Sequence, residues 1–182
     1  VGGIGLAAGG ALAGFRVVTV VGLLTYLGGI AVVGSALVEP ARRRPPATFA
    51  TWSVLAGMVW LVGSLLAVTV RIAAAPDWSA AAERAGWLTA PLLAGFTAQV
   101  LLGALSYLPT AVRAANAMFD RAWPARVTAA NAGLLVCVLP VPSLVRVLAS
   151  VVVLAALASF LPLAVRAIRA ARMPQEGRPS PD

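Results

Sequence analysis

The sequence contains neither histidine nor lysine, has one cysteine, and is poor in charge, since only 11% of its residues are Asp, Glu, Lys or Arg. Without histidine the chain lacks the usual axial ligand of haem, the commonest metal ligand and the commonest general base. The single Cys137 cannot form a disulfide within the chain. Paired carboxylates and a nucleophile beside a base are missing as well. We therefore predict no catalytic, cofactor-binding or metal-binding residue in this chain, and the sequence leaves open whether it belongs to an enzyme.

Apolar residues dominate the composition. They make up 60% of the chain, and the mean hydropathy is +0.92. Soluble domains are about 45–50% apolar and about 25% charged, and disordered chains are more polar still. The composition therefore predicts an all-α polytopic integral membrane helix bundle in the cell membrane, with the lipid bilayer as its first partner.

The charge balance is strongly basic, with a formal net charge of +8 and fourteen basic residues, all of them arginines. A balance of this kind can indicate nucleic-acid binding. Here, however, the arginines lie between apolar runs and do not gather on one polar face. Membrane topology explains that pattern better, so we predict no nucleic-acid partner.

Long apolar runs predict four complete transmembrane helices, because about 20 such residues cross a bilayer. Residues 128–145 form a fifth, marginal run, which Pro140 and Pro142 interrupt, so it either crosses the membrane or is re-entrant. The run at 1–14 is too short to cross a core of about 30 Å, and we expect a partial helix there, part of a longer protein. The complete helices are expected at 17–38, 48–70, 87–109 and 147–165.

The segments between these runs carry the polar residues. We expect a loop at 39–47 (EPARRRPPA), since proline cannot continue a helix. Tryptophans edge the connection at 71–86, as in an interfacial aromatic belt. At 110–127 apolar residues recur at helical spacing, which predicts a short interfacial helix ended by Pro124. Residues 1–172 thus form the membrane domain, and 173–182 a disordered tail or linker.

The distribution of arginine predicts the orientation in the membrane. The loops 39–47 and 110–127 and residues 166–182 hold ten of the fourteen arginines, and the opposite side holds four. The positive-inside rule places the ten in the cytoplasm, provided that 128–145 crosses. The four on the opposite side are Arg16, Arg71, Arg84 and Arg146.

A polar residue lies within the 87–109 run, where Gly95, Gln99 and Gly103 are spaced by four and fall within about 80° of one another on a helix. The glycines would let a neighbouring helix approach, and Gln99 would share a hydrogen bond with it. The alternative is a polar site in a transport pathway. No Asp, Glu or Lys lies within a predicted span, which argues against a pump or a proton-coupled transporter. Gly5–Gly9 and Gly10–Gly14 predict further small-residue packing.

Soft sulfur atoms are the remaining candidates for copper. They lie on separate segments without Met-x-x-Met or Cys-x-x-Cys spacing, so we expect Met58 and Cys137 to fill core space. Arg42–Arg44 could hold anionic lipid headgroups, although topology alone accounts for them. The four sulfur-bearing residues are Met58, Met118, Cys137 and Met173.

Four stretches follow one another along the chain: PATFATWSVLAGMVWLVGSLLAV (46–68), LTAPLLAGFTAQVLLGALSYLP (88–109), RVTAANAGLLVCVLPVPSLVRVLAS (126–150) and SFLPLAVRAIRAAR (159–172). Together they resemble the membrane region that precedes the cupredoxin domains of actinobacterial multicopper oxidase or nitrite-reductase-like proteins. The likeness covers roughly residues 40–172. The chain departs from the family by passing directly from Pro109 to Thr-Ala-Val-Arg, without a Gly-Gly-Pro insertion, which puts in doubt any site on that loop.

The resemblance implies a non-catalytic membrane anchor of a copper-dependent oxidoreductase. Copper would then be bound by a cupredoxin-type domain of the parent protein, and none of its ligands lies in this chain. Other interpretations stay open: a subunit for assembly with other membrane helices, a carrier of an uncharged solute, or a subunit linked to haem or quinone. The sequence does not identify a substrate, a partner or an oligomeric state.

Overall fold

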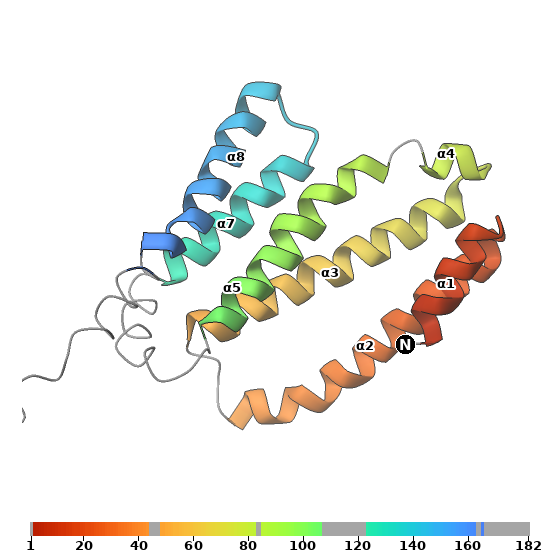
Figure 1. Cartoon of the computed structure of the whole chain (residues 1–182), viewed down its shortest axis with the longest axis horizontal. Helices are drawn as coiled ribbons and strands as arrows, with labels where there is room; N and C mark the ends of the chain where they lie inside the picture. Colours follow the sequence, from red (N-terminus) through yellow and green to blue (C-terminus); the bar gives the residue numbers. More distant parts are fainter. Residues whose placement is uncertain (1, 44–47, 83–84, 107–122, 163–164, 166–182) are drawn as a thin grey trace, which may run out of the picture. The chain divides into compact units, whose positions relative to one another are not determined.

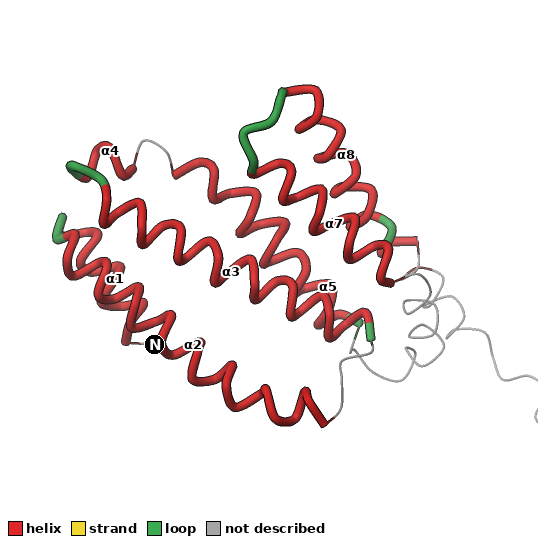
Figure 2. The backbone as a smooth tube through the Cα atoms, turned by 180° about the vertical axis from the view of Figure 1, so that it is seen from behind, coloured by secondary structure: helices red, strands yellow, loops and turns green. Residues whose placement is uncertain are grey.

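The structure is a computed structural model, and it describes residues 2–43, 48–82, 85–106, 123–162 and 165. This part of the chain is 91% helical and contains no strand, which confirms the all-α prediction (Figure 2). The elements are α1 (Gly2–Leu12), α2 (Arg16–Arg43), α3 (Phe49–Ala74), α4 (Trp78–Ala82), the 3-10 helix η1 (Ala85–Leu88), the π-helix η2 (Pro91–Ala98), α5 (Gln99–Leu105), α7 (Trp123–Val138) and α8 (Ser143–Ala158) (Figure 1).

Three of the described helices are long and apolar enough to cross a bilayer: α2, α3 and the stretch Ser143–Pro162, which includes α8. A fourth span requires Trp78–Leu88 and Pro91–Leu105 to act together across a bend of 50°. The prediction of four complete spans is therefore not confirmed. Large apolar side chains cover the surface of these helices, as expected where lipid replaces water as the solvent.

Helix α2 continues beyond the expected end of the 17–38 run, and Pro40 lies inside it. The prediction that a loop begins at residue 39 is wrong. Pro40 has no main-chain N–H to donate to the Ala36 carbonyl oxygen, so α2 lacks one main-chain hydrogen bond near its end. Glu39 also accepts a hydrogen bond from Arg43 Nε at 2.9 Å, an i,i+4 ion pair that favours one more helical turn.

Prolines also set the bounds of the last two helices. Pro124 is the second residue of α7, so it lies in the first turn of this helix. Its fixed φ suits the first helical turn. Pro140 and Pro142 lie in the turn between α7 and α8, so α7 ends at Val138 and α8 begins at Ser143, both inside the expected 128–145 run. At 16 residues, α7 rises about 24 Å, less than a typical bilayer core of about 30 Å. The rest of the expected interfacial helix lies outside the described residues.

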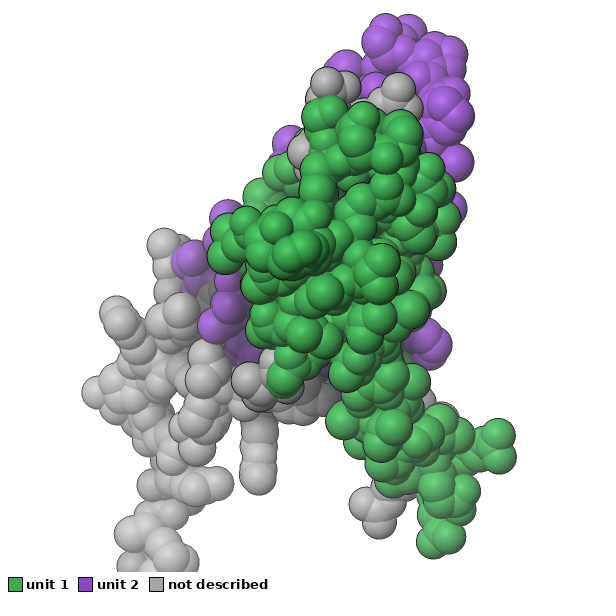
Figure 3. All heavy atoms as spheres, turned by 90° about the vertical axis from the view of Figure 1, so that its right-hand side faces the viewer, with its two compact units in different colours: residues 1–47, 55–97 green, residues 48–54, 98–182 purple. Residues whose placement is uncertain are grey.

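The chain divides into two compact units, coloured separately in Figure 3. The first comprises Val1–Ala47 and Leu55–Thr97, and the second comprises Thr48–Val54 and Ala98–Asp182. In the first unit, α1 and α2 lie side by side and are joined by a turn in which Gly14 has a φ of +75° (Figure 1). A positive φ of this size is unfavourable for residues other than glycine.

Glycine allows α1 and α2 to pack backbone against backbone. A Cβ atom on Gly10 would lie 2.7 Å from the Thr19 amide nitrogen, and one on Gly22 would overlap the Ala7 backbone. Gly5 and Gly9 do not pack against α2, because a Cβ on either would meet nothing within 4 Å. The other face of α1 therefore packs against α2, and close contact between the two main chains replaces the apolar side-chain core that a soluble helix pair would use.

In the second unit, a glycine likewise allows the two helices of the α7–α8 hairpin to pack closely. A Cβ atom on Gly133 would lie 2.9 Å from Val153 Cγ2 and 3.1 Å from the Ala149 carbonyl oxygen. Leu134 is 3% exposed, and Ala149 and Val153 are buried as well. The small side chains of α7 and α8 thus set the distance between the two helices.

A pair of glycine substitutions on α2 tests whether this close packing stabilises the α1–α2 hairpin. Gly22→Ala should lower the free energy of unfolding by about 1–3 kcal/mol, because the added methyl group overlaps the α1 backbone. Gly29→Ala is the matched control, since a Cβ there meets nothing within 4 Å, and it should raise stability by roughly 0.5–1 kcal/mol through helix propensity. Thermal unfolding in detergent measures both. Equal effects of the two substitutions would contradict the assignment.

Candidate functional site

The most buried amide of the chain's described part lies in the second unit, where Gln99 on α5 faces Asn131 on α7. Gln99 is 4% exposed. Its Nε2 donates a hydrogen bond to Asn131 Oδ1 at 3.0 Å, and its Oε1 accepts one from Asn131 Nδ2 at 3.2 Å. Asn131 Nδ2 also donates to the Val127 carbonyl oxygen at 2.7 Å, one turn earlier in the same helix. The nitrogen and the oxygen of each amide therefore both take part in the pair.

This reciprocal pairing decides between the two interpretations of Gln99. A polar residue that serves a transport pathway or a ligand needs a donor or acceptor directed toward that partner. The oxygen and the nitrogen of the Gln99 amide both engage Asn131. In lipid such a pair joins helices with about 0.6–2 kcal/mol. The geometry therefore favours the structural interpretation.

Gly103 lies one turn after Gln99 and contacts the first turns of α3. A Cβ atom on Gly103 would lie 2.8 Å from Val54 Cγ2 and 3.0 Å from the Ala50 carbonyl oxygen. The expected close approach of a neighbouring helix is thus confirmed at this glycine. The two residues contact different helices, because Gly103 contacts α3 whereas Gln99 is bonded to α7. Gly95 is buried as well.

The π-helix η2, which precedes Gln99, was not predicted from the sequence. Its main chain bonds residues five apart, and the Thr97 hydroxyl likewise donates to the Leu92 carbonyl oxygen at 2.9 Å. Pro91, which has no N–H to donate, is fully buried at its start. A proline inside the expected 87–109 run was the one available signal of this irregularity. Four-residue spacing from Gly95 to Gln99 consequently does not follow ideal α-helical geometry.

A small cavity of about 20 Å³ lies beside Gln99, which is room for about one water molecule. At its rim the guanidinium carbon of Arg126 lies 5.3 Å from the centroid of the Phe49 ring, and Phe49 stacks on Phe160 with centroids 6.5 Å apart. The cavity is too small for an organic substrate or a haem. Its lining includes Ser53, Gln99, Leu102, Arg126, Ala130 and Ser159.

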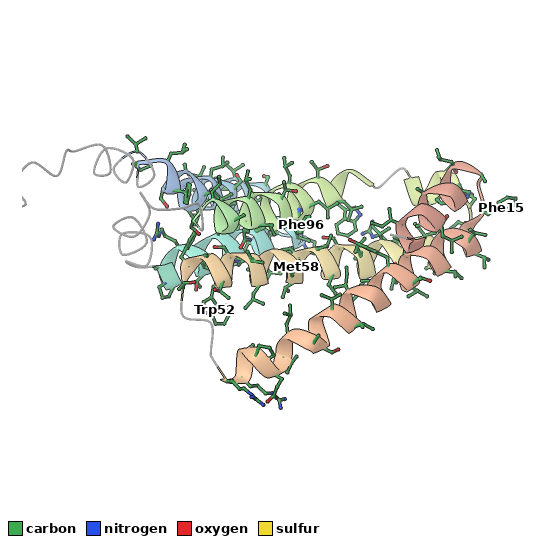
Figure 4. The ribbon with its side chains drawn as sticks, turned by 60° about the horizontal axis from the view of Figure 1, so that its bottom comes forward. Phe15, Trp52, Met58 and Phe96 are labelled. Atoms are coloured by element: carbon green, nitrogen blue, oxygen red, sulfur yellow. The ribbon has the colours of Figure 1, made fainter. Side chains whose placement is uncertain are left out.

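The sulfur-bearing candidates lie apart from this cavity. Met58 lies on α3 and is half-buried (Figure 4). Cys137, also half-buried, makes a weak contact of 3.7 Å from Sγ to the Arg146 carbonyl oxygen. Met118 and Met173 lie outside the described residues. Within the part of the chain that the structure describes, no three His, Cys, Asp or Glu residues are grouped so that they could hold a metal ion.

Two other predicted features concern the ends of the helices. Arg42 and Arg43 lie exposed in the last turn of α2, where a positive charge is favoured by the helix dipole. Arg44 and Tyr107 lie outside the described residues.

Compared with models of protein families, with curated proteins and with solved structures, the chain matches none. The resemblance to the membrane region of copper oxidoreductases consequently stays a prediction.

Substitution of the two paired amides tests their structural role. Gln99→Leu should lower the free energy of unfolding by about 0.6–2 kcal/mol, because it removes the interhelical bonds and leaves Asn131 without this partner. Asn131→Leu should act similarly, and the double variant should cost less than the two single variants together. Thermal unfolding in detergent, with insertion monitored by membrane fractionation, measures the cycle. Unchanged melting temperatures would remove the structural assignment.

Proposed function

We propose that the chain is the membrane-embedded domain of a copper-dependent oxidoreductase of the multicopper oxidase or nitrite-reductase-like kind, and that it holds the catalytic part at the membrane. The four stretches that resemble that family support this role. Copper and redox chemistry would belong to a cupredoxin-type domain of the parent protein. This chain would contribute attachment and position.

The observation that carries the non-catalytic part of the proposal is the reciprocal Gln99–Asn131 pair. A catalytic or transport site places polar groups toward a substrate, and in a membrane such groups are costly unless they are used. Here the buried Gln99 amide and the half-buried Asn131 amide bond to each other at 3.0 and 3.2 Å. The adjoining cavity of about 20 Å³ admits no substrate larger than water. These features fit a domain whose polar groups serve its own packing.

A second candidate, a subunit that assembles with other membrane helices, is favoured by the exposed glycines of α2. A Cβ atom on Gly28, Gly29 or Gly34 would meet nothing within 4 Å, so another helix could approach the main chain there. Roles as a solute carrier or a haem- or quinone-linked subunit have less support. For haem, the absence of histidine from the sequence would demand unusual ligation.

The proposed orientation places the Arg42–Arg44 end of α2 and the 110–127 segment in the cytoplasm. In the first unit, Arg16 Nη1 donates to the Pro76 carbonyl oxygen at 2.9 Å, so the start of α2 and the end of α3 lie at one end. In this proposal α2, α3 and the stretch from η2 to α5 cross the membrane in alternating directions. Helix α7 then crosses back despite its short length. The arginine distribution supports this topology.

Purification of the native protein tests the anchor role directly. The protein, tagged at its own gene and isolated in mild detergent, should carry stoichiometric copper, measured by inductively coupled plasma mass spectrometry, in a polypeptide with cupredoxin His and Cys ligands. A preparation that lacks both copper and such a polypeptide contradicts the proposal. In that case a haem absorbance spectrum, or solute uptake after reconstitution, would identify one of the alternatives.

Cysteine labelling in intact cells tests the topology. In a Cys137→Ser background, Ala41→Cys at the exposed end of α2 should resist a membrane-impermeant maleimide, because it faces the cytoplasm. Ser79→Cys, exposed at the other end of the first unit, is the matched control and should be labelled. Ser143→Cys should be labelled as well if α7 crosses. Labelling of Ala41→Cys in sealed cells would reverse the orientation.

A further inference from the structure

A cleft of about 170 Å³ lies in the first unit, at the end of α3. Helix α3, helix α4 and the 3-10 helix η1 supply its walls, which contain one cation, two indole rings and otherwise aliphatic side chains. The cleft is much larger than the cavity beside Gln99 and belongs to no function described above. Its lining residues are Val68, Arg71, Ile72, Trp78, Ala81, Trp87 and Leu88.

Two hydrogen-bonding residues hold the Trp78 wall in place. Trp78 Nε1 donates to the Gly14 carbonyl oxygen at 2.6 Å, in the turn between α1 and α2. From the same turn, Arg16 Nη2 donates to the Ala73 carbonyl oxygen at 3.1 Å and Nη1 to Pro76 at 2.9 Å. The Ala73 carbonyl lies in the last turn of α3, where carbonyl groups have no partner within the helix. The connection that follows α3 is therefore held by hydrogen bonds to Gly14 and Arg16, and the cleft is formed before any ligand binds.

Arg71 is held in a position suited to an anion. Its guanidinium carbon lies 4.7 Å from the centroid of the Trp87 ring, within the range of a cation–π contact. A guanidinium is planar and always charged, and it can bind phosphate oxygens with two parallel hydrogen bonds. Arg71 is exposed, so a headgroup can reach it from the membrane surface.

The nearby carboxylate of Asp77 already accepts hydrogen bonds from its own loop. Its Oδ1 accepts hydrogen bonds from the Ala80 amide at 2.8 Å and from the Ser79 hydroxyl at 2.7 Å. The hydrogen bond from the Ala80 backbone, with that from Ser79 and the charge of Arg16, lowers the pKa of Asp77 below its usual value. Asp77 is ionised at neutral pH, but it does not line the cleft. Arg71 is the charged group of the lining.

The surroundings identify the membrane surface as the source of the ligand. Tryptophan and arginine at the end of an apolar helix are typical of the interface between hydrocarbon and water. Phe15, 64% exposed at the α1–α2 turn, adds an apolar side chain at the same end of the unit (Figure 4). A free aqueous anion would engage Arg71 but leave the walls of Val68, Ile72 and Leu88 without a partner. A phospholipid supplies both a phosphate and an acyl chain.

We propose that this cleft binds an anionic phospholipid, with the phosphate on Arg71 and the first part of an acyl chain against the aliphatic walls. Trp78 and Trp87 enclose the glycerol region. The lipid would fasten the connection after α3 to the bilayer surface. This assignment is independent of the proposed link to a copper enzyme.

Native mass spectrometry of the full chain, with phosphatidylglycerol or phosphatidylcholine added to the detergent, tests the site. The wild-type protein should retain phosphatidylglycerol in preference to phosphatidylcholine. Arg71→Gln should weaken that retention roughly tenfold, since it removes one charge-assisted contact. Arg146→Gln is the matched control: it removes an exposed arginine that does not line the cleft and should leave retention unchanged.

Further measurements keep the outcome interpretable. Thermal unfolding checks that Arg71→Gln still folds; if it does not, Arg71→Lys retains the charge without the planar fork and should still lower retention. Added glycerol phosphate should fail to displace the lipid. The proposal is overturned if glycerol phosphate displaces the lipid at equal concentration, if both lipids are retained equally, or if Arg146→Gln acts as strongly as Arg71→Gln.

Discussion

The main-chain N–H and C=O groups of a chain in lipid have no water to bond with, and this constraint shapes the rest of the structure. Helices meet it within a single segment, so the described residues are almost entirely helical and covered by Val, Leu and Ala. Because lipid is as apolar as these side chains, burying them against one another gains little. The helices must therefore be joined by close packing and by a few hydrogen bonds.

Both means of joining helices are present. Gly10 and Gly22 bring the main chains of α1 and α2 together in the first unit, and Gly133 does the same for α7 and α8 in the second. The Gln99–Asn131 pair adds a polar connection between α5 and α7. Polar side chains at the helix ends serve a different purpose, since they meet the main-chain groups that the helices leave unpaired. Arg16, which donates to carbonyl groups after and within α3, is the clearest case.

The sequence predicted the structure correctly where a residue type has the same physical effect at every position. Long apolar runs predicted an all-helical fold, and two glycines around Gln99 predicted a buried face and a close helix approach at Gly103. Prolines were less informative, because their effect depends on position: Pro40 lies inside α2 near its end, and Pro124 lies in the first turn of α7. The partner Asn131 could not be predicted, since nothing local indicates which helix faces Gln99. The π-helix was missed because regular spacing was assumed.

The central claim is that this chain is the membrane domain of a copper-dependent oxidoreductase and contributes no catalytic group. The most direct measurement is the nucleotide sequence of the gene and its neighbours in the source genome. The account predicts a cupredoxin-type region with His and Cys copper ligands, encoded in the same reading frame or in an adjacent gene of the same operon. A reading frame and operon without any such region would contradict the claim and leave helix assembly as the better-supported role.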